Sequence, residues 1–120
     1  MSYREEIFNF SKNKYNTSPE YTFKKYPKYA VLRHMDNKKW YGLIMNVPSS
    51  KLGLSSENEI DIIDIKLPKN EIEVLRFKKG FFPAYHMNKE NWISISLEGQ
   101  VPLSEILELI EYSFSLTQKA

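Results

Sequence analysis

Two apolar segments separated by a short polar turn constrain the fold of this chain more than any other feature. Residues 29–34 (YAVLRH) and 39–47 (KWYGLIMNV) are rich in β-branched and aromatic side chains, and Met35-Asp36-Asn37-Lys38 lies between them. This pattern is typical of a β-hairpin. The second segment is apolar almost throughout, which predicts a central strand with one face in the core and the other partly covered. We therefore expect an antiparallel sheet built around this hairpin.

The remaining elements follow from hydrophobic spacing, capping residues, proline and glycine. Ser2 and Glu5 form a capping-box pattern at the start of a helical repeat. The predicted segments are helices at 3–15, 68–80 and 102–114, strands at 60–67 and 92–97, an extended stretch at 84–87 and a long loop at 48–59. The order α-β-β-β-α-β-α, with room for one more short strand, predicts an α+β fold in which helices pack on a mainly antiparallel sheet. We expect residues 1–120 to form a single domain.

Composition excludes several classes of protein. The absence of cysteine excludes disulfides, thiolate zinc sites, iron–sulfur clusters and thiol nucleophiles. Four glycines provide no phosphate-cradling loop, and no Gly-x-Ser-x-Gly motif occurs. No apolar run approaches the roughly 20 residues of a membrane span, and the acidic start of the chain does not resemble a signal peptide. We expect a soluble, cytoplasmic, monomeric protein without a cofactor, and a binding protein rather than an enzyme.

A metal site would have to use the two histidines, His34 and His86, with the carboxylates Asp61 and Asp64. Zinc and iron sites usually need three convergent ligands. Asp61 and Asp64 are three residues apart on a strand, so their side chains face opposite sides of the sheet. The sequence therefore predicts no metal site.

Charge is distributed unevenly along the chain. Residues 1–56 carry a net charge of +6 and residues 57–120 a net charge of −4. Between residues 12 and 41, basic residues alternate with aromatic ones, a composition that suits a nucleic-acid surface because cations neutralise phosphates and aromatic rings stack on bases. The ordinary alternative is that the lysines are solvated and the aromatics form the core. The candidate contacts in this segment are Lys24, Lys25, Lys28, Arg33, Lys38 and Lys39.

A second candidate site is the segment 81–92 (FFPAYHMNKENW). His86, Asn88 and Lys89 would form a polar lip for an anion, close to Lys66 and Arg76. The alternative is that His86 is a core imidazole bonded to backbone or to an acid. In that case Asn88 is a turn former that makes an Asx turn, and Trp92 is a core anchor.

The residues Ala84-Tyr85-His86-Met87-Asn88-Lys89-x-x-Trp92 resemble the signature of the MmcQ/YjbR-like family. The likeness extends to the strand-to-helix junction at residues 65–68 and to the final helix with its Tyr112-Ser113-Phe114 cluster. Glu90-Asn91 departs from the family pattern, in which a basic residue and a histidine often precede the tryptophan, and the 48–59 loop is longer than usual.

The resemblance implies an α+β fold similar to the CyaY (frataxin) arrangement and to a double-wing DNA-binding domain. DNA binding is thus an analogy of fold. A frataxin-like iron role would require an acidic first helix, whereas this helix also carries Arg4, Lys12 and Lys14.

Together, these patterns predict a small binding module with DNA as its leading partner. The first alternative is a pocket near His86 for a small molecule or anion, with an enzyme as a less favoured form of it. The second is a protein-interaction domain that uses the aromatic hairpin. A contiguous basic face would favour nucleic acid, and a concave site around an accessible His86 would favour a small ligand.

Overall fold

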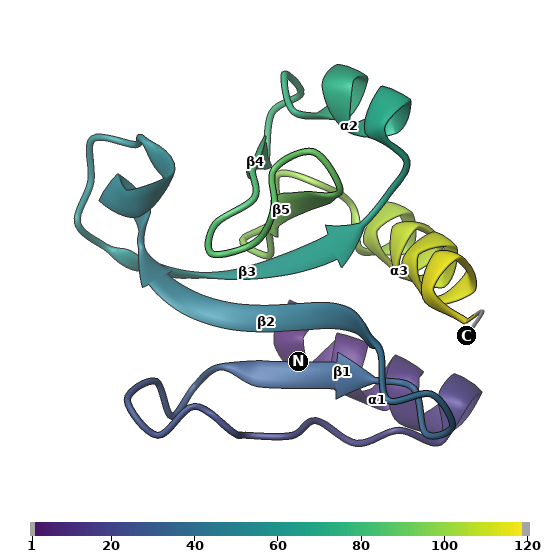
Figure 1. The fold of residues 1–120 in the computed structure, drawn as a ribbon. Coiled ribbons are helices and arrows are strands. Elements are labelled where there is room, and N and C mark those ends of the chain that lie inside the picture. Colours follow the sequence, from purple (N-terminus) through teal and green to yellow (C-terminus); the bar gives the residue numbers. More distant parts are fainter. Residues whose placement is uncertain (1, 119–120) are drawn as a thin grey trace.

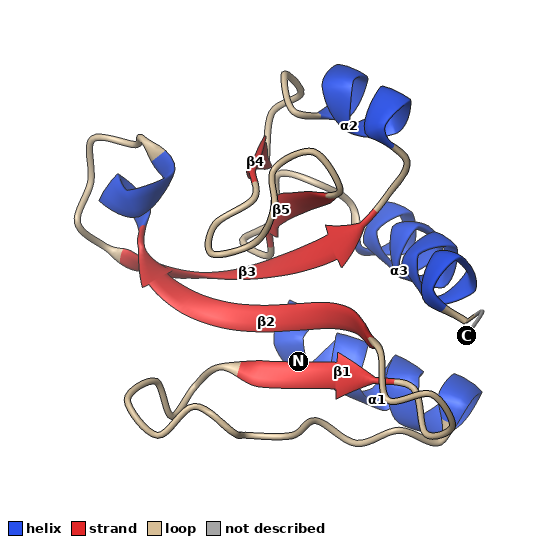
Figure 2. Ribbon diagram, viewed as in Figure 1, coloured by secondary structure: helices blue, strands red, loops and turns tan. Residues whose placement is uncertain are grey.

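A computed structural model describes residues 2–118, which form three α-helices, a short 3-10 helix and one five-stranded sheet (Figures 1 and 2). The elements in chain order are α1 (Tyr3–Tyr15), β1 (Ala30–Arg33), β2 (Trp40–Pro48), η1 (Ser49–Leu52), β3 (Glu59–Lys66), α2 (Lys69–Leu75), β4 (Phe81–Pro83), β5 (Trp92–Ser96) and α3 (Leu103–Thr117). The predicted α+β class and element order are confirmed, with β4 as the additional short strand.

The sheet has the strand order β1-β2-β3-β5-β4, and every neighbouring pair is antiparallel. The predicted hairpin forms β1 and β2, with Ala30 opposite Ile44 and a bulge between Leu32 and Arg33. Glu20 forms an isolated bridge with Val31 outside the β1 edge. The long strands β2 and β3 therefore lie at the centre, as the apolar character of residues 39–47 predicts.

The two faces of the sheet are covered by different kinds of structure. Helices α1 and α3 lie on one face, where residues such as Ile7, Ile63 and Ile106 form the larger apolar cluster (Figure 1). A smaller cluster fills the second face, and no helix of more than four residues contributes to it within residues 2–118. Its buried members are Tyr29, Val31, Leu43, Met45, Val47 and Ile62, and the residues packed on them are Phe23, Trp40, Leu52, Ile60, Tyr85 and Met87. The second face is thus closed mainly by loops.

Helix α2 is shorter than expected. It ends at Leu75 rather than near Gly80, because the chain then makes turns in which the Lys78 N–H bonds to the Leu75 carbonyl and the Phe81 N–H to the Lys78 carbonyl. Gly80 has a φ of +91°, which reverses the chain so that β4 can pair with β5. The capping box of α1 is confirmed, since Ser2 and Glu5 bond to each other's backbone N–H.

The stretch around residues 84–87 also differs from the prediction. The strand is Phe81–Pro83, and the chain then leaves the sheet, with His86 at a φ of +69°. The side chains of this stretch therefore do not alternate between inward and outward positions. Phe81 and Ala84, three residues apart, are both buried. The 48–59 loop is shorter than expected as well, because Pro48 ends β2, residues 49–52 form η1 and Glu59 begins β3.

Candidate functional site

A cavity of about 330 Å³ lies over the second face of the sheet, and we call it the aromatic pocket. Its volume is at the lower end of the range typical of small-molecule sites. The residues lining it are Phe23, Tyr26, Tyr29, Trp40, Leu43, His86 and Met87.

Two loops and the hairpin build this pocket. In the segment before β1, successive turns bond the Tyr26 N–H to the Phe23 carbonyl and the Tyr29 N–H to the Tyr26 carbonyl. These turns stack the rings of Tyr26 and Tyr29, with centroids 4.5 Å apart and planes 14° apart. Phe23 lies edge-on to Tyr29 at 5.7 Å and to Trp40 at 6.2 Å. From the β4–β5 loop, the His86 ring approaches Tyr26 at 6.4 Å and Tyr29 at 6.3 Å.

A second cavity of about 250 Å³ shares Tyr26 and Tyr29 with the aromatic pocket, and we call it the lysine cavity. Its other lining residues are Lys25, Pro27, Lys28, Asn46 and Glu59. Across residues 2–118, neither Lys25 nor Lys28 forms an ion pair, whereas Lys14 pairs with Glu111 at 3.0 Å. Two lysines that form no ion pair within residues 2–118 therefore lie beside the stacked tyrosines, in a cavity that Glu59 also lines.

A buried carboxyl lies in the sheet behind the aromatic pocket. Asp64 is fully buried and sits between Leu43 of β2, which lines the pocket, and Ser94 of β5. The Ser94 hydroxyl donates to Asp64 Oδ1 and accepts the Tyr85 N–H at 2.9 Å. Within the described part of the chain, Asp64 Oδ2 has no hydrogen-bond partner. Burial raises the pKa of Asp64 to about 7, against the opposing effects of the Ser94 bond and the Lys89 charge.

The β4–β5 loop is held by its own polar contacts. The Lys89 ammonium donates to the Ala84 carbonyl at 2.7 Å. The Asn88 carboxamide accepts the Glu90 N–H at 2.8 Å, which confirms the predicted Asx turn. Together with the Tyr85–Ser94 bond, these contacts fix the backbone on both sides of His86.

The two histidines lie in different environments, one exposed and one buried. His86 is exposed and lines the aromatic pocket, so the interpretation of His86 as a core imidazole is wrong. The buried histidine is His34, whose Nε2 lies 2.8 Å from the Thr117 hydroxyl. Burial lowers the pKa of His34. Trp92 is only half-buried and belongs to neither apolar cluster, so it does not act as the expected core anchor.

The fold brings together only some of the residues that the sequence selects. Lys25, Lys28 and His86 lie on either side of the stacked tyrosines, with exposed Lys24 in the same segment. Asn88 and Lys89 shape the loop that carries His86.

The other candidates lie elsewhere and line neither cavity. Arg33 pairs with Glu20 at 3.2 Å. Lys38 and Lys39 lie at the β1–β2 turn, and Lys66 ends β3. Arg76 follows α2 and is exposed, with its guanidinium 4.8 Å from the Phe77 ring centroid.

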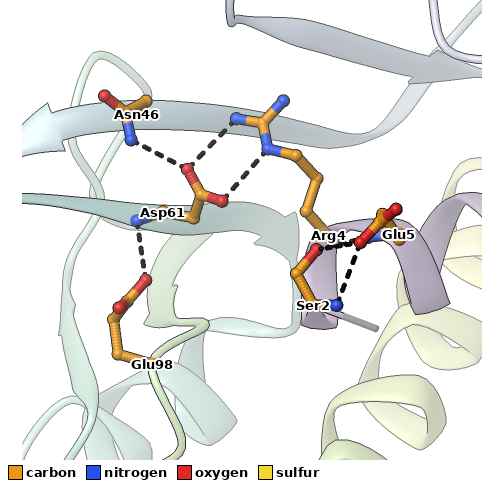
Figure 3. A network of polar contacts seen from close by, with 6 residues as sticks. All are labelled: Ser2, Arg4, Glu5, Asn46, Asp61 and Glu98. Carbon is orange, nitrogen blue, oxygen red and sulfur yellow. Dashed lines mark hydrogen bonds and ion pairs between the residues drawn. The ribbon is translucent and has the colours of Figure 1, made fainter.

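Asp61 of β3 forms a network of polar contacts on the opposite face of the sheet (Figure 3). Its carboxylate accepts two bonds from the Arg4 guanidinium, at 3.1 and 3.3 Å, and one from the Asn46 carboxamide at 3.0 Å. Its N–H donates to the Glu98 carboxylate at 3.1 Å. This network ties α1 to the central strands, and the predicted separation of Asp61 from Asp64 is confirmed.

Residues 2–118 contain neither a cluster of metal ligands nor a membrane-spanning helix. There, no three histidine, aspartate or glutamate side chains gather as a metal ion would require. In the same residues, no helix is long and apolar enough to cross a bilayer.

Sequence reasoning missed Asp64 and Ser94 as parts of this region. The available signal was an acid placed between isoleucines in the run IDIIDI, a position where an unpaired charge is costly. The role of the aromatics of residues 23–29 in closing the second face had no such signal.

Comparisons with known proteins identify the family of this chain. A profile of the YjbR family matches residues 12–116. The uncharacterized protein YyaQ of Bacillus subtilis (strain 168) is 55% identical over 98% of this chain and 100% of its own length. A crystal structure of a Pseudomonas syringae protein, 45% identical, superposes with a TM-score of 0.92 over 95% of this chain and 97% of that one. Protein DR2400 of Deinococcus radiodurans, 20% identical, shares the fold with a TM-score of 0.75 over 99% of this chain and 80% of that one. The chain therefore belongs to the YjbR family, as the motif around His86 predicts.

Proposed function

We propose that the protein binds a small molecule with a planar ring in the aromatic pocket. The observation that supports this function best is an accessible His86 beside the stacked rings of Tyr26 and Tyr29, in a concave site. Tyr26 keeps 47% of its surface exposed although it takes part in the stack. An exposed ring that is already held in place loses little conformational freedom when a ligand stacks on it.

The chemistry of the lining supports a flat ligand. Aromatic faces and the Met87 thioether favour contact with a ring, and the hydroxyl of Tyr26 and the imidazole of His86 provide polar groups that can orient it. This arrangement favours the small-ligand hypothesis over binding of duplex DNA through a broad basic face.

A titration with indole and with adenosine, followed by ¹H–¹⁵N spectra, tests the proposal. We expect shift changes in residues 21–29 and 84–91, and a loss of about fivefold in affinity in Tyr26→Leu, because one stacking contact is worth about 1 kcal/mol. Tyr21→Leu is the matched control, since Tyr21 is 57% exposed in the same segment and lines neither cavity. Shift changes confined to other regions, or an equal loss in both variants, would refute the proposal.

Single-stranded nucleic acid is the second candidate ligand. The observation favouring it is that Lys24, Lys25 and Lys28 are exposed on the segment that presents the Tyr26 ring. Cations that follow a backbone beside aromatic stacking platforms are typical of single-strand binding surfaces. Fluorescent single-stranded and duplex DNA titrated at increasing salt would test it. Binding that is absent at low salt, or that does not weaken as salt rises, would exclude a phosphate-based mode.

A further inference from the structure

The carboxyl of Asp64 is buried and lies outside the lining of the aromatic pocket. Its neighbours connect it to the pocket in two ways. Across β2 it faces Leu43, which forms part of the pocket lining. Across β5 it receives the Ser94 hydroxyl, which in turn accepts the Tyr85 N–H at 2.9 Å, one residue before His86.

Asp64 Oδ2 is the part of this carboxyl that the surroundings leave unsatisfied. No hydrogen-bond partner for it exists within residues 2–118, and its side chain has no contact with solvent. A buried polar atom without a partner costs free energy, and an ionised one costs more. The arrangement is therefore suited to the neutral carboxyl, and the raised pKa agrees with this assignment.

Three charged or titratable groups lie around Asp64, and they come from two segments, the β4–β5 loop and the residues before β1. Lys89 in the β4–β5 loop exerts a favourable charge effect on it, and Tyr29 before β1 senses the Asp64 charge. Tyr85 in the loop is the third, since its N–H bonds to Ser94. Of these, Lys89 is the one positive charge, and its ammonium is bonded to the Ala84 carbonyl instead of to Asp64.

We propose that Asp64 is a proton-dependent positioning residue for the aromatic pocket. When Asp64 is neutral, Lys89 stays on the Ala84 carbonyl and the loop holds His86 and Met87 in the pocket lining. When Asp64 loses its proton to solvent, the buried carboxylate attracts the Lys89 ammonium. The Lys89–Ala84 bond then breaks, and the loop that carries His86 and Met87 shifts.

This inference rests on the proposed function for its biological meaning, because it describes how that pocket is controlled. The affinity for a planar ligand falls as the pH rises through the range in which Asp64 ionises.

The first experiment uses the protein without ligand. The Asp64 carboxyl carbon and the amides of residues 84–91 are followed by NMR from pH 5 to pH 9. We expect the loop amides and the carboxyl carbon to show a common inflection, and Asp64→Asn to abolish that inflection in the amides. Because the two proteins differ only at residue 64, the difference between their amide profiles isolates Asp64. Identical amide profiles in the two proteins would overturn the proposal.

The second experiment measures indole binding at pH 5.5 and pH 8.5. We expect the affinity of the natural protein to fall by about tenfold or more at the higher pH, since one ionisation can change a binding constant tenfold per pH unit. Asp64→Asn should retain the affinity measured at low pH. Asp61→Asn, changed on the same strand but the opposite face, should keep the natural pH profile. An unchanged profile in Asp64→Asn overturns the proposal. If indole binds at neither pH, the proposed function fails, and the amide profile still decides the role of Asp64.

Discussion

Replacing Asp64 by asparagine should stabilise the protein at neutral and alkaline pH and leave its stability nearly unchanged at acid pH. The side chain is fully buried between Leu43 and Ser94, and one of its oxygens has no partner within residues 2–118. Asparagine has almost the same shape and preserves an oxygen that can accept the Ser94 hydroxyl, but it cannot ionise. The substitution therefore removes a buried charge without creating a cavity.

The size of this effect on the free energy of unfolding follows from the pKa of Asp64, which burial raises from 3.8 to about 7. Between these two values the folded protein retains a proton that the unfolded chain has released, so the free energy of unfolding falls as the pH rises. Well below pH 3.8 both states are protonated, and well above pH 7 both are ionised. Each pKa unit corresponds to about 1.4 kcal/mol, so the ionisation costs the folded state about 4 kcal/mol above pH 7.

Urea unfolding followed by tryptophan fluorescence at pH 4.5, 6 and 8 measures this effect. We expect the free energy of unfolding of Asp64→Asn to exceed that of the natural protein by about 2–4 kcal/mol at pH 8 and by only about 1 kcal/mol at pH 4.5. The lowered pKa of His34 gives the opposite slope, because stability is lost as the pH falls through its unfolded value of 6.5. That slope is common to both proteins and cancels in the difference. A difference that does not grow with pH, or a variant less stable at pH 8, would refute the reasoning.

Substitutions at two further positions test local features of the structure. Asp61→Asn should lower the free energy of unfolding at pH 7 by about 1–2 kcal/mol, because it weakens the two part-buried bonds from the Arg4 guanidinium. Urea unfolding measures this change. A decrease below about 0.3 kcal/mol would contradict a stabilising role for the network. At His86, whose φ is +69°, alanine should cost about 1 kcal/mol of stability and asparagine much less, because asparagine tolerates the left-handed region. Thermal unfolding compares the two variants, and equal stabilities would show that the backbone conformation at residue 86 is not maintained.

The sheet and its helix-covered face could be predicted because they depend on short-range patterns. The hairpin of β1 and β2 is encoded by two apolar segments and a turn, and α1 by the bonds that Ser2 and Glu5 exchange. The isoleucines of β5 alternate with serines, which predicts a strand with one face in the core. Each of these signals lies within a few residues of the structure that it specifies.

The candidate site could be predicted only in part, because it depends on contacts between distant segments. The composition of residues 12–41 selects Lys25 and Lys28, and the polar segment 81–92 selects His86. The sequence does not show that stacking of Tyr26 on Tyr29 places them around one site. His86 leaves the core through a left-handed backbone conformation, which a histidine adopts without any characteristic sequence signal.

The serines of β5 show why an alternating pattern does not by itself identify an exposed face. Such alternation usually places the polar set in solvent, yet Ser94 and Ser96 are both buried. Each hydroxyl holds a loop: Ser94 accepts the Tyr85 N–H, and Ser96 accepts the Glu98 N–H at 3.2 Å and donates to the Gln100 carboxamide at 2.8 Å. An apolar side chain at either position would leave a backbone N–H without its partner, at a cost of about 1–3 kcal/mol if that N–H stayed buried. The isoleucines of this strand therefore complete the helix-covered core, and its serines hold the loops on the other face, including the loop that places His86 in the aromatic pocket.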